Sequence, residues 1–224
     1  MKVCHLSLLV IFSFLVSCGG GGGAGGSSEA NGNFGSGNVR FIHGSLASPP
    51  VTLATADGVI IFPEAEFLGV PTRAEISPGS AQFTVSDRVG RVSLRRGNLV
   101  SEAGLTTLFF YGDSQVGGVN MVALQGGVPD LAQSEAAFRV VHGVVQAASL
   151  EIAVPGIAPP DAVPFGGSSS YFVVPAGETR ISVSRESDGR GVQTVAPVLE
   201  SGESYTIVFA GEIGIFVSAR TYQD

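Results

Sequence analysis

VRFIHG at residues 39–44 recurs as FRVVHG at residues 138–143, 99 positions further along the chain. Four further segments recur in the same order: VTLAT at 51–55 as LEIAV at 150–154, FLG at 67–69 as FGG at 165–167, ISPG at 76–79 as VPAG at 174–177, and EAG at 102–104 as ESG at 200–202. Ordered matches at a nearly constant spacing indicate an internal duplication. Most of the chain is therefore one unit written twice.

Each unit has the periodicity of β-strands. Apolar and polar residues alternate at 81–86, 91–95, 179–184 and 205–209, which is typical of half-buried strands. Turn signals such as Pro78-Gly79 and Pro155-Gly156 separate these runs. About seven short strands in roughly 90 residues favour a β-sandwich. The sequence thus predicts an all-β fold of two tandem antiparallel β-sandwich domains, immunoglobulin-like or transthyretin-like.

The predicted domains are residues 39–124 and residues 138–224, joined by a linker at 125–137. A unit of this size can bury a small core of its own, which favours two domains over one. A single continuous barrel built from both halves is the alternative architecture.

The N-terminus has the features of an export signal. Lys2 precedes an apolar run at residues 6–16 that is too short to cross a bilayer. LVSC at residues 15–18 resembles the lipobox of bacterial lipoproteins. The resemblance implies that residues 1–17 are removed and that Cys18 becomes a lipidated N-terminus. An ordinary secreted protein cleaved nearby, or an uncleaved anchor, are the alternatives.

Residues 18–38 are predicted to be a tether. Ten of the 20 residues from 19 to 38 are Gly, and ordering them would cost more backbone entropy than burial could offset. A phosphate-binding loop is disfavoured because the GxxxxGK[ST] pattern is absent. Gly19 stands where some Gram-negative lipoproteins carry an Asp that retains them in the inner membrane. We therefore expect a lipid-anchored cell-envelope protein, in the outer membrane rather than the inner one.

The composition excludes several functions. The 224 residues carry a formal charge of -7, and the only lysine is Lys2, so non-specific nucleic-acid binding is disfavoured. Both cysteines, Cys4 and Cys18, lie near the N-terminus, which excludes a disulfide scaffold and a cysteine zinc site. After residue 18 no apolar run is long enough to span a bilayer. We expect no cofactor and no metal.

Several of these motifs together resemble a known family. VRFIHGS at residues 39–45, the PG or PAG turn before an alternating strand, and the ExG turn before an aromatic-rich strand are similar to the domain of unknown function 4397 family. The resemblance covers residues 39–224, as tandem copies. It implies a β-sandwich in an exported protein and no established chemistry. His-Gly at positions 43–44 departs from the His-Ala-Ser that the family favours.

Two motifs could be read as catalytic. His43 and His142 occupy equivalent positions and could form a metal pair or act as general bases, but duplication alone explains the pairing, and no second ligand stands at metal spacing. Each ring is expected to bond a turn within its own domain. Gly112-Asp113-Ser114 resembles the nucleophile block of a hydrolase family, but the partner histidine block is missing, so a hairpin turn is favoured.

Arg88, Arg91, Arg95 and Arg96 form the one basic concentration. They could contact an anionic ligand, because Arg binds carboxylate and phosphate with two hydrogen bonds. A charged strand face that prevents edge-to-edge aggregation is the simpler interpretation. Glu64 and Glu66 could be an acid/base pair, and are more simply polar loop residues.

These observations predict a non-enzymatic cell-envelope lipoprotein that displays paired β-sandwich modules for binding or adhesion. Its expected partners are the membrane, through the lipid, and an envelope polysaccharide or protein. The alternative is an envelope hydrolase acting on glycan or peptide. A nucleophile and a base within hydrogen-bond reach in one pocket would favour that alternative.

Overall fold

The computed structural model describes residues 37–77, 79–100, 104–115, 118–125 and 127–224. Their regular structure consists of strands, and within these ranges there is no helix. None of the described residues therefore forms a helix able to cross a membrane. The all-β prediction is confirmed.

The first half forms two four-stranded sheets. The inner sheet has the order β4-β1-β7-β8 and the outer sheet the order β3-β2-β5-β6. The strands are β1 (Gly37–Leu46), β2 (Val51–Thr55), β3 (Ile60–Ala65), β4 (Arg73–Ile76), β5 (Gly79–Asp87), β6 (Val92–Val100), β7 (Leu105–Asp113) and β8 (Gly118–Leu124).

The second half repeats this arrangement. Its inner sheet has the order β12-β9-β17-β18, its outer sheet the order β11-β10-β14-β15, and β13 pairs with β16. The strands are β9 (Glu135–Val145), β10 (Ser149–Ala153), β11 (Val163–Pro164), β12 (Phe172–Pro175), β13 (Gly177–Glu178), β14 (Ile181–Arg185), β15 (Gly191–Val195), β16 (Val198–Leu199), β17 (Ser204–Glu212) and β18 (Phe216–Gln223).

Each half is a β-sandwich, as predicted, with one parallel strand pair at its centre. β1 runs parallel to β7, and β9 runs parallel to β17, while the other pairs among the described strands are antiparallel. In these pairs Arg40 lies beside Thr107 and Arg139 lies beside Thr206. The two halves therefore share both strand order and register, as a duplicated unit should.

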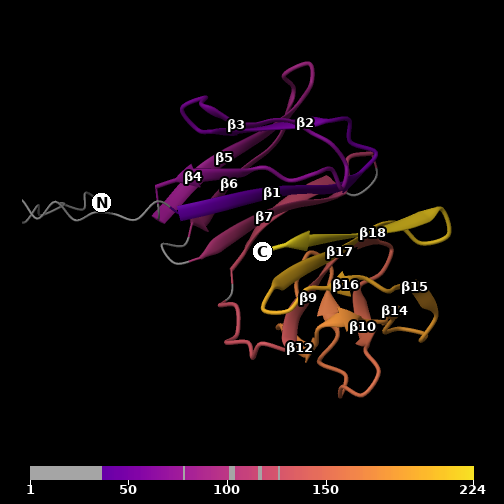
Figure 1. Cartoon of the computed structure of the whole chain (residues 1–224). Helices are drawn as coiled ribbons and strands as arrows, with labels where there is room; N and C mark the ends of the chain where they lie inside the picture. Colours follow the sequence, from indigo (N-terminus) through magenta and orange to yellow (C-terminus); the bar gives the residue numbers. More distant parts are fainter. Residues whose placement is uncertain (1–36, 78, 101–103, 116–117, 126) are drawn as a thin grey trace, which may run out of the picture. The chain divides into compact units, whose positions relative to one another are not determined.

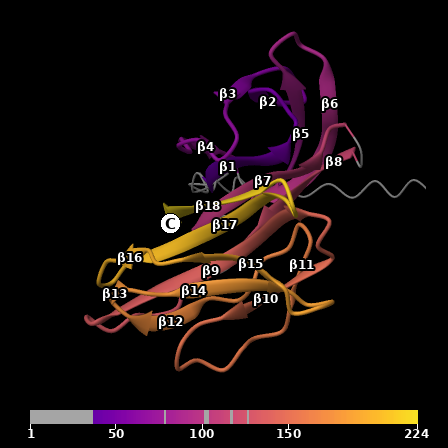
Figure 2. The same cartoon turned by 90° about the vertical axis from the view of Figure 1, so that its right-hand side faces the viewer.

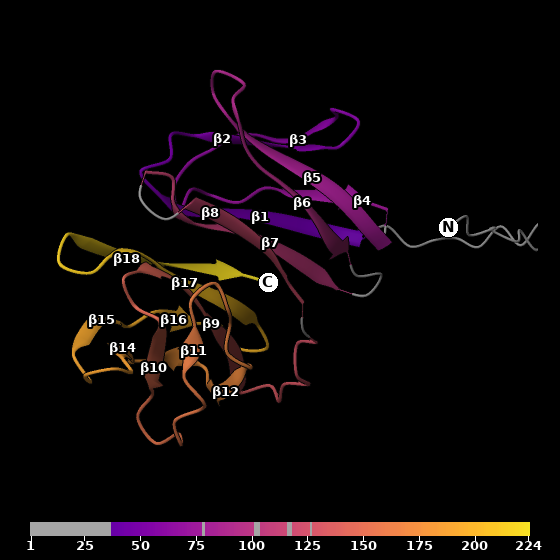
Figure 3. The ribbon, with the colours of Figure 1, turned by 180° about the vertical axis from the view of Figure 1, so that it is seen from behind.

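Three apolar layers separate the four large sheets. One core lies between the two sheets of the first half and contains Phe41, Leu53, Phe83 and Phe110. A second lies between the two sheets of the second half. The third joins the halves and includes Phe109, Val141, Val208 and Tyr222. Figures 1 and 2 show the outer sheet of the first half, then the two inner sheets, then the outer sheet of the second half. Figure 3 shows the same sheets from behind.

The third layer lies between the two inner sheets, and we call it the seam. β1 contacts β17 there, and β7 contacts β9. Because strand residues alternate in direction, β1 directs Phe41 into its own core and Ile42 into the seam. Both faces of each inner sheet are thus covered, which explains why β1, β9, β7 and β17 are almost continuously buried.

Candidate functional site

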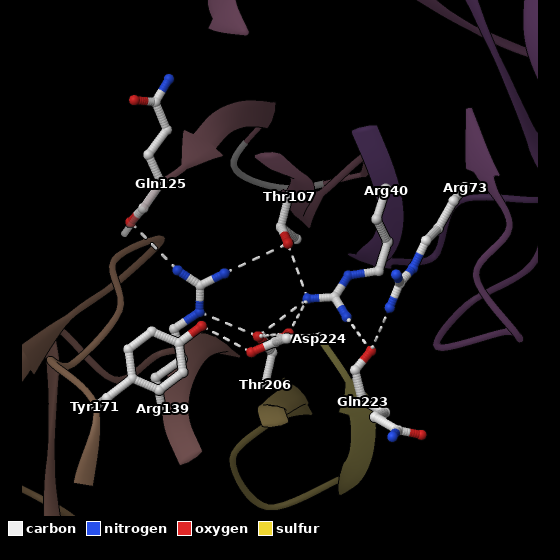
Figure 4. A network of polar contacts seen from close by, with 9 residues as sticks. All are labelled: Arg40, Arg73, Thr107, Gln125, Arg139, Tyr171, Thr206, Gln223 and Asp224. Atoms are coloured by element: carbon white, nitrogen blue, oxygen red, sulfur yellow. Dashed lines mark hydrogen bonds and ion pairs between the residues drawn. The ribbon is translucent and has the colours of Figure 1, made fainter. Parts of the chain in front are cut away.

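Arg40 and Arg139 are buried arginines at equivalent positions of β1 and β9. Their exposed fractions are 1% and 3%. Each lies between apolar residues that point the other way, into the core of its own half, such as Phe41 and Phe138. The alternation of the strand therefore directs both guanidinium groups into the seam, where they meet from opposite halves (Figure 4).

Two threonines link the guanidinium groups. Arg40 Nη2 donates to Thr107 Oγ1 at 2.8 Å and to Thr206 Oγ1 at 3.0 Å. Arg139 donates from Nε to Thr206 Oγ1 at 3.0 Å and from Nη2 to Thr107 Oγ1 at 3.4 Å. Each threonine thus accepts hydrogen bonds from its own half and from the other half, so these bonds fix the two halves against each other.

One carboxylate completes the network on the Arg40 side. Asp224 Oδ1 lies 2.7 Å from Arg40 Nη2 and accepts from Thr206 Oγ1 at 2.7 Å, while Oδ2 accepts from the Tyr171 hydroxyl at 2.7 Å. Burial lowers the pKa of Arg40, and the Asp224 charge opposes that shift. Burial and the same charge raise the pKa of Tyr171, so its hydroxyl stays protonated and donates.

The Arg139 side lacks the corresponding carboxylate. Arg40 Nη1 donates to the Gln223 carbonyl at 3.1 Å, and Arg139 Nη1 donates to the Gln125 carbonyl at 3.3 Å. In the sequence, Gln223 is followed by Asp224 but Gln125 is followed by Gly126. Among the described residues, Arg139 forms no ion pair. The centroid of the Tyr171 ring lies 5.3 Å from the guanidinium carbon of Arg139.

A cavity of about 440 Å³ opens beside this network. Arg73 on β4 and Arg139 on β9 both line it, together with Tyr171 and Asp224. Arg73 is exposed and donates to the Gln223 carbonyl at 3.2 Å. The cavity therefore receives side chains from both repeats and carries two guanidinium groups and the Asp224 carboxylate, which is paired with Arg40.

The equivalent histidines are buried in turn contacts, as predicted. His43 Nδ1 accepts from the Ser45 amide at 3.2 Å, and Nε2 donates to the Pro49 carbonyl at 3.3 Å. His142 repeats this with Val144 at 3.1 Å and Ala147 at 3.0 Å. Burial lowers the pKa of both rings to about 4, so each imidazole is neutral at pH 7.

Three of the four arginines of the predicted basic concentration contact other residues of the first half. Exposed Arg88 pairs with Glu64 at 3.5 Å, and Arg91 pairs with Asp87 at 2.8 Å. Arg96 bonds across to Asn120 and the Met121 carbonyl on β8. The backbone of Arg95 lies opposite that of Thr84 in the β5–β6 ladder. A ligand contact at these four arginines stays a prediction.

The two other sequence candidates are placed by the ends of strands. The prediction that Glu64 is a loop residue is wrong, because Glu64 lies within β3. Gly112-Asp113-Ser114 ends β7 in the β7–β8 hairpin, where Ser114 Oγ donates to the Ala47 carbonyl at 2.9 Å. Glu66 lies in a loop after β3, where its carbonyl accepts from the Gly69 amide. Within the described ranges, no group of three His, Cys, Asp or Glu side chains could hold a metal ion. Cys18 lies outside the described residues.

Sequence reasoning treated Arg40 and Arg139 only as part of the repeated VRFIHG signature and assigned them no role. A signal was present. A charged residue with apolar residues directly before and after it in a strand is rarely buried without a partner, and here it occurs at the same position in both repeats.

Comparisons with known proteins bear mainly on the second half. A family model described as "Domain of unknown function (DUF4397)" matches residues 136–223, from β9 to β18. The match supports the family resemblance for this half. A search of curated proteins found no match.

Two solved structures are distantly similar. One is CBMbc (family CBM26) of Eubacterium rectale Amy13K in complex with maltoheptaose: 8% identity, TM-score 0.27, covering 84% of this chain and 97% of that chain. The other is the fimbrial anchor protein Mfa2 from Porphyromonas gingivalis: 10% identity, TM-score 0.26, covering 84% of this chain and 98% of that chain. Likeness at these values says nothing about function.

Proposed function

We propose that this chain is a non-enzymatic bacterial cell-envelope lipoprotein that presents two β-sandwich repeats as one binding unit. In this proposal Cys18 carries the lipid, residues 18–38 tether the fold to the membrane, and the outer membrane is its location. The export signal and the Gly-rich segment support the anchoring part. The shared register of the two halves supports tandem copies of one domain.

The observation that carries the binding part is the cavity beside the seam. Its lining comes from both repeats, and the hydrogen bonds between Arg40, Arg139 and the two threonines hold these linings together. Binding pockets commonly combine an apolar wall with a few converging polar groups, and they occur preferentially where two domains meet. Here the converging groups are Arg73, Arg139 and Tyr171.

Anchoring is tested by changing Cys18 to Ser in the full chain and separating soluble from membrane fractions. Because the acyl chains on Cys18 are the expected anchor, Cys18→Ser should move the protein to the soluble fraction. Cys4→Ser is the matched control, since Cys4 lies in the segment that would be removed, and it should remain in the membrane. If Cys18→Ser stays in the membrane and the wild type is also found at full precursor length, the segment is an uncleaved anchor instead.

Binding is tested separately with the purified full chain in detergent. The chain is passed over immobilised envelope polysaccharide and over immobilised envelope protein, and one of the two should retain it. The membrane location is a separate question, which density separation of inner and outer membranes tests. Retention by neither fraction would contradict the binding role without affecting the anchor.

A further inference from the structure

The two buried arginines differ in how their charge is balanced. The Arg40 guanidinium lies 2.7 Å from the Asp224 carboxylate. Arg139 is as deeply buried, but its partners among the described residues are two threonine hydroxyls, one carbonyl and the Tyr171 ring. A buried charge without an opposite charge is costly. An anion beside Arg139 would therefore be stabilised more strongly than one at an exposed arginine.

The charge that an entering ligand would meet can be counted from the lining. Asp224 lines the cavity, but its carboxylate already accepts from Arg40, Thr206 and Tyr171. Arg73 and Arg139 are thus left as two positive charges on the same cavity.

Hydrogen-bond donors are also available there. A guanidinium has five N–H groups, and contacts with described residues use three of those on Arg139 and one on Arg73. A planar carboxylate is the ligand that a guanidinium binds with two parallel hydrogen bonds.

We propose that this cavity binds the carboxylate of a small organic acid between Arg139 and Arg73, with the ligand's carbon skeleton against Tyr171 and Leu105. The proposal rests on the binding role proposed above and names the ligand class. In a cell envelope such a carboxylate occurs on acidic sugars and at peptide C-termini. The shared chemistry is one carboxylate on a compact body that fits about 440 Å³.

The test measures binding to the full chain in detergent by titration calorimetry. The probes are sodium glucuronate for the acidic sugar, N-acetylalanine for the peptide terminus, and glucose as the neutral control. The two acids are compared at constant ionic strength, because exposed charges are screened by salt. We expect at least one acid to bind and glucose not to bind.

Arg73→Gln is the decisive variant, because Arg73 is exposed and its loss should leave the fold intact. We expect it to weaken binding about 10-fold or more, as the loss of a charge-assisted hydrogen bond does. Arg180→Gln is the matched control. The substitution removes the same charge, and Arg180 is exposed and lies outside the cavity. It should bind as the wild type does.

Arg139→Gln should abolish binding, but Arg139 also holds the seam, so its melting temperature must be measured alongside. Tyr171→Phe provides the second test, since it keeps the ring while freeing a lone pair of Asp224 that repels the ligand. It should weaken binding without abolishing it.

Binding of both acids would show that the carboxylate itself is recognised, and binding of only one would identify its source. Equal binding of glucose and glucuronate, no binding of either acid, or unchanged affinity in Arg73→Gln would overturn the proposal. None of these results depends on Cys18, so a failed ligand test and a failed anchoring test are distinguishable.

Discussion

Arg40 on β1 and Asp224 after β18 form a buried ion pair at 2.7 Å, with their side chains 1% and 3% exposed. The pair joins the first strand of the first half to the end of the last strand of the second half, 184 positions apart. A contact at such sequence separation forms only when both halves are folded and in register. Loss of this ion pair therefore indicates that the two halves have separated at the seam.

Asp224→Asn should destabilise the chain strongly. The substitution keeps the shape of the side chain but leaves the Arg40 guanidinium buried without a counter-charge, and breaking a buried pair from one side costs about 3–5 kcal/mol. Urea unfolding followed by circular dichroism measures this loss. The matched control is Asp161→Asn, because Asp161 is exposed and should change the free energy of unfolding by less than about 0.5 kcal/mol. Equal effects of the two variants would contradict a stabilising role for the pair.

Gly44 and Gly143 make room for one aromatic ring. A Cβ at Gly44 would lie 2.5 Å from the Phe109 ring, and one at Gly143 would lie 2.7 Å from it. These are the glycines of the two His-Gly pairs. Glycine at both positions has a physical reason: the inner sheets approach closely, and Phe109 fills the space between them.

Gly44→Ala should therefore destabilise the chain by about 1–3 kcal/mol, the usual cost of overpacking. Combining it with Phe109→Leu should cost less than the sum of the two single changes, because the smaller side chain removes the clash. Gly191→Ala is the control, since a Cβ there meets no atom within 4 Å. Simple additivity in the double variant would indicate that the ring does not contact position 44. Thermal or urea unfolding provides each value.

His43 and His142 should make the chain acid-sensitive between about pH 6.5 and pH 4. Burial holds both pKa values at about 4 in the folded state, against about 6.5 in the unfolded chain. The unfolded state therefore binds more protons in this window, and stability falls as the pH is lowered through it. At pH 5 the loss is on the order of 2 kcal/mol for each ring.

The measurement is the free energy of unfolding from pH 8 to pH 4, compared with His142→Gln. The variant removes one titrating ring, so its stability should depend less steeply on pH even if it is lower throughout. Parallel curves for wild type and variant would show that His142 does not titrate in this range.

The sequence could predict the sandwich fold because its signals are local. Apolar and polar residues alternate in strands such as β5 and β14, and this alternation indicates which face of the strand is buried. Turn residues indicate where strands end, and the recurrence of VRFIHG indicates that the arrangement occurs twice. The parallel pairing of β1 with β7 was not predictable in this way, since it joins strands far apart in the chain and both are buried on both faces.

The candidate site was missed for a related reason. Arg73, Arg139 and Tyr171 come from three distant segments, and only the packing of the two inner sheets brings them to one cavity. By contrast, Arg88, Arg91, Arg95 and Arg96 are close in sequence and therefore conspicuous. The structure places Arg88 and Arg91 beside carboxylates and Arg96 against β8. Proximity in sequence therefore did not identify the arginines that line the cavity.

The second repeat should fold without the first, but with an exposed seam. Residues 135–224 contain a complete core of their own, which includes Phe138, Ile152, Ile181 and Phe209. This core favours a cooperative all-β fold for the fragment. Its inner sheet, however, would lose the cover that Ile42, Phe109 and Leu124 provide in the full chain.

We therefore expect the fragment to melt cooperatively but at a lower temperature than the full chain, and to self-associate through the uncovered face, because large exposed apolar patches drive association. Circular dichroism measures the melting and sedimentation velocity the association. Val208→Ser, on the seam face of β17, should reduce association of the fragment. A fragment without cooperative melting would show that the two repeats form one interdependent folding unit, and a monomeric, fully stable fragment would show that the seam contributes little to stability.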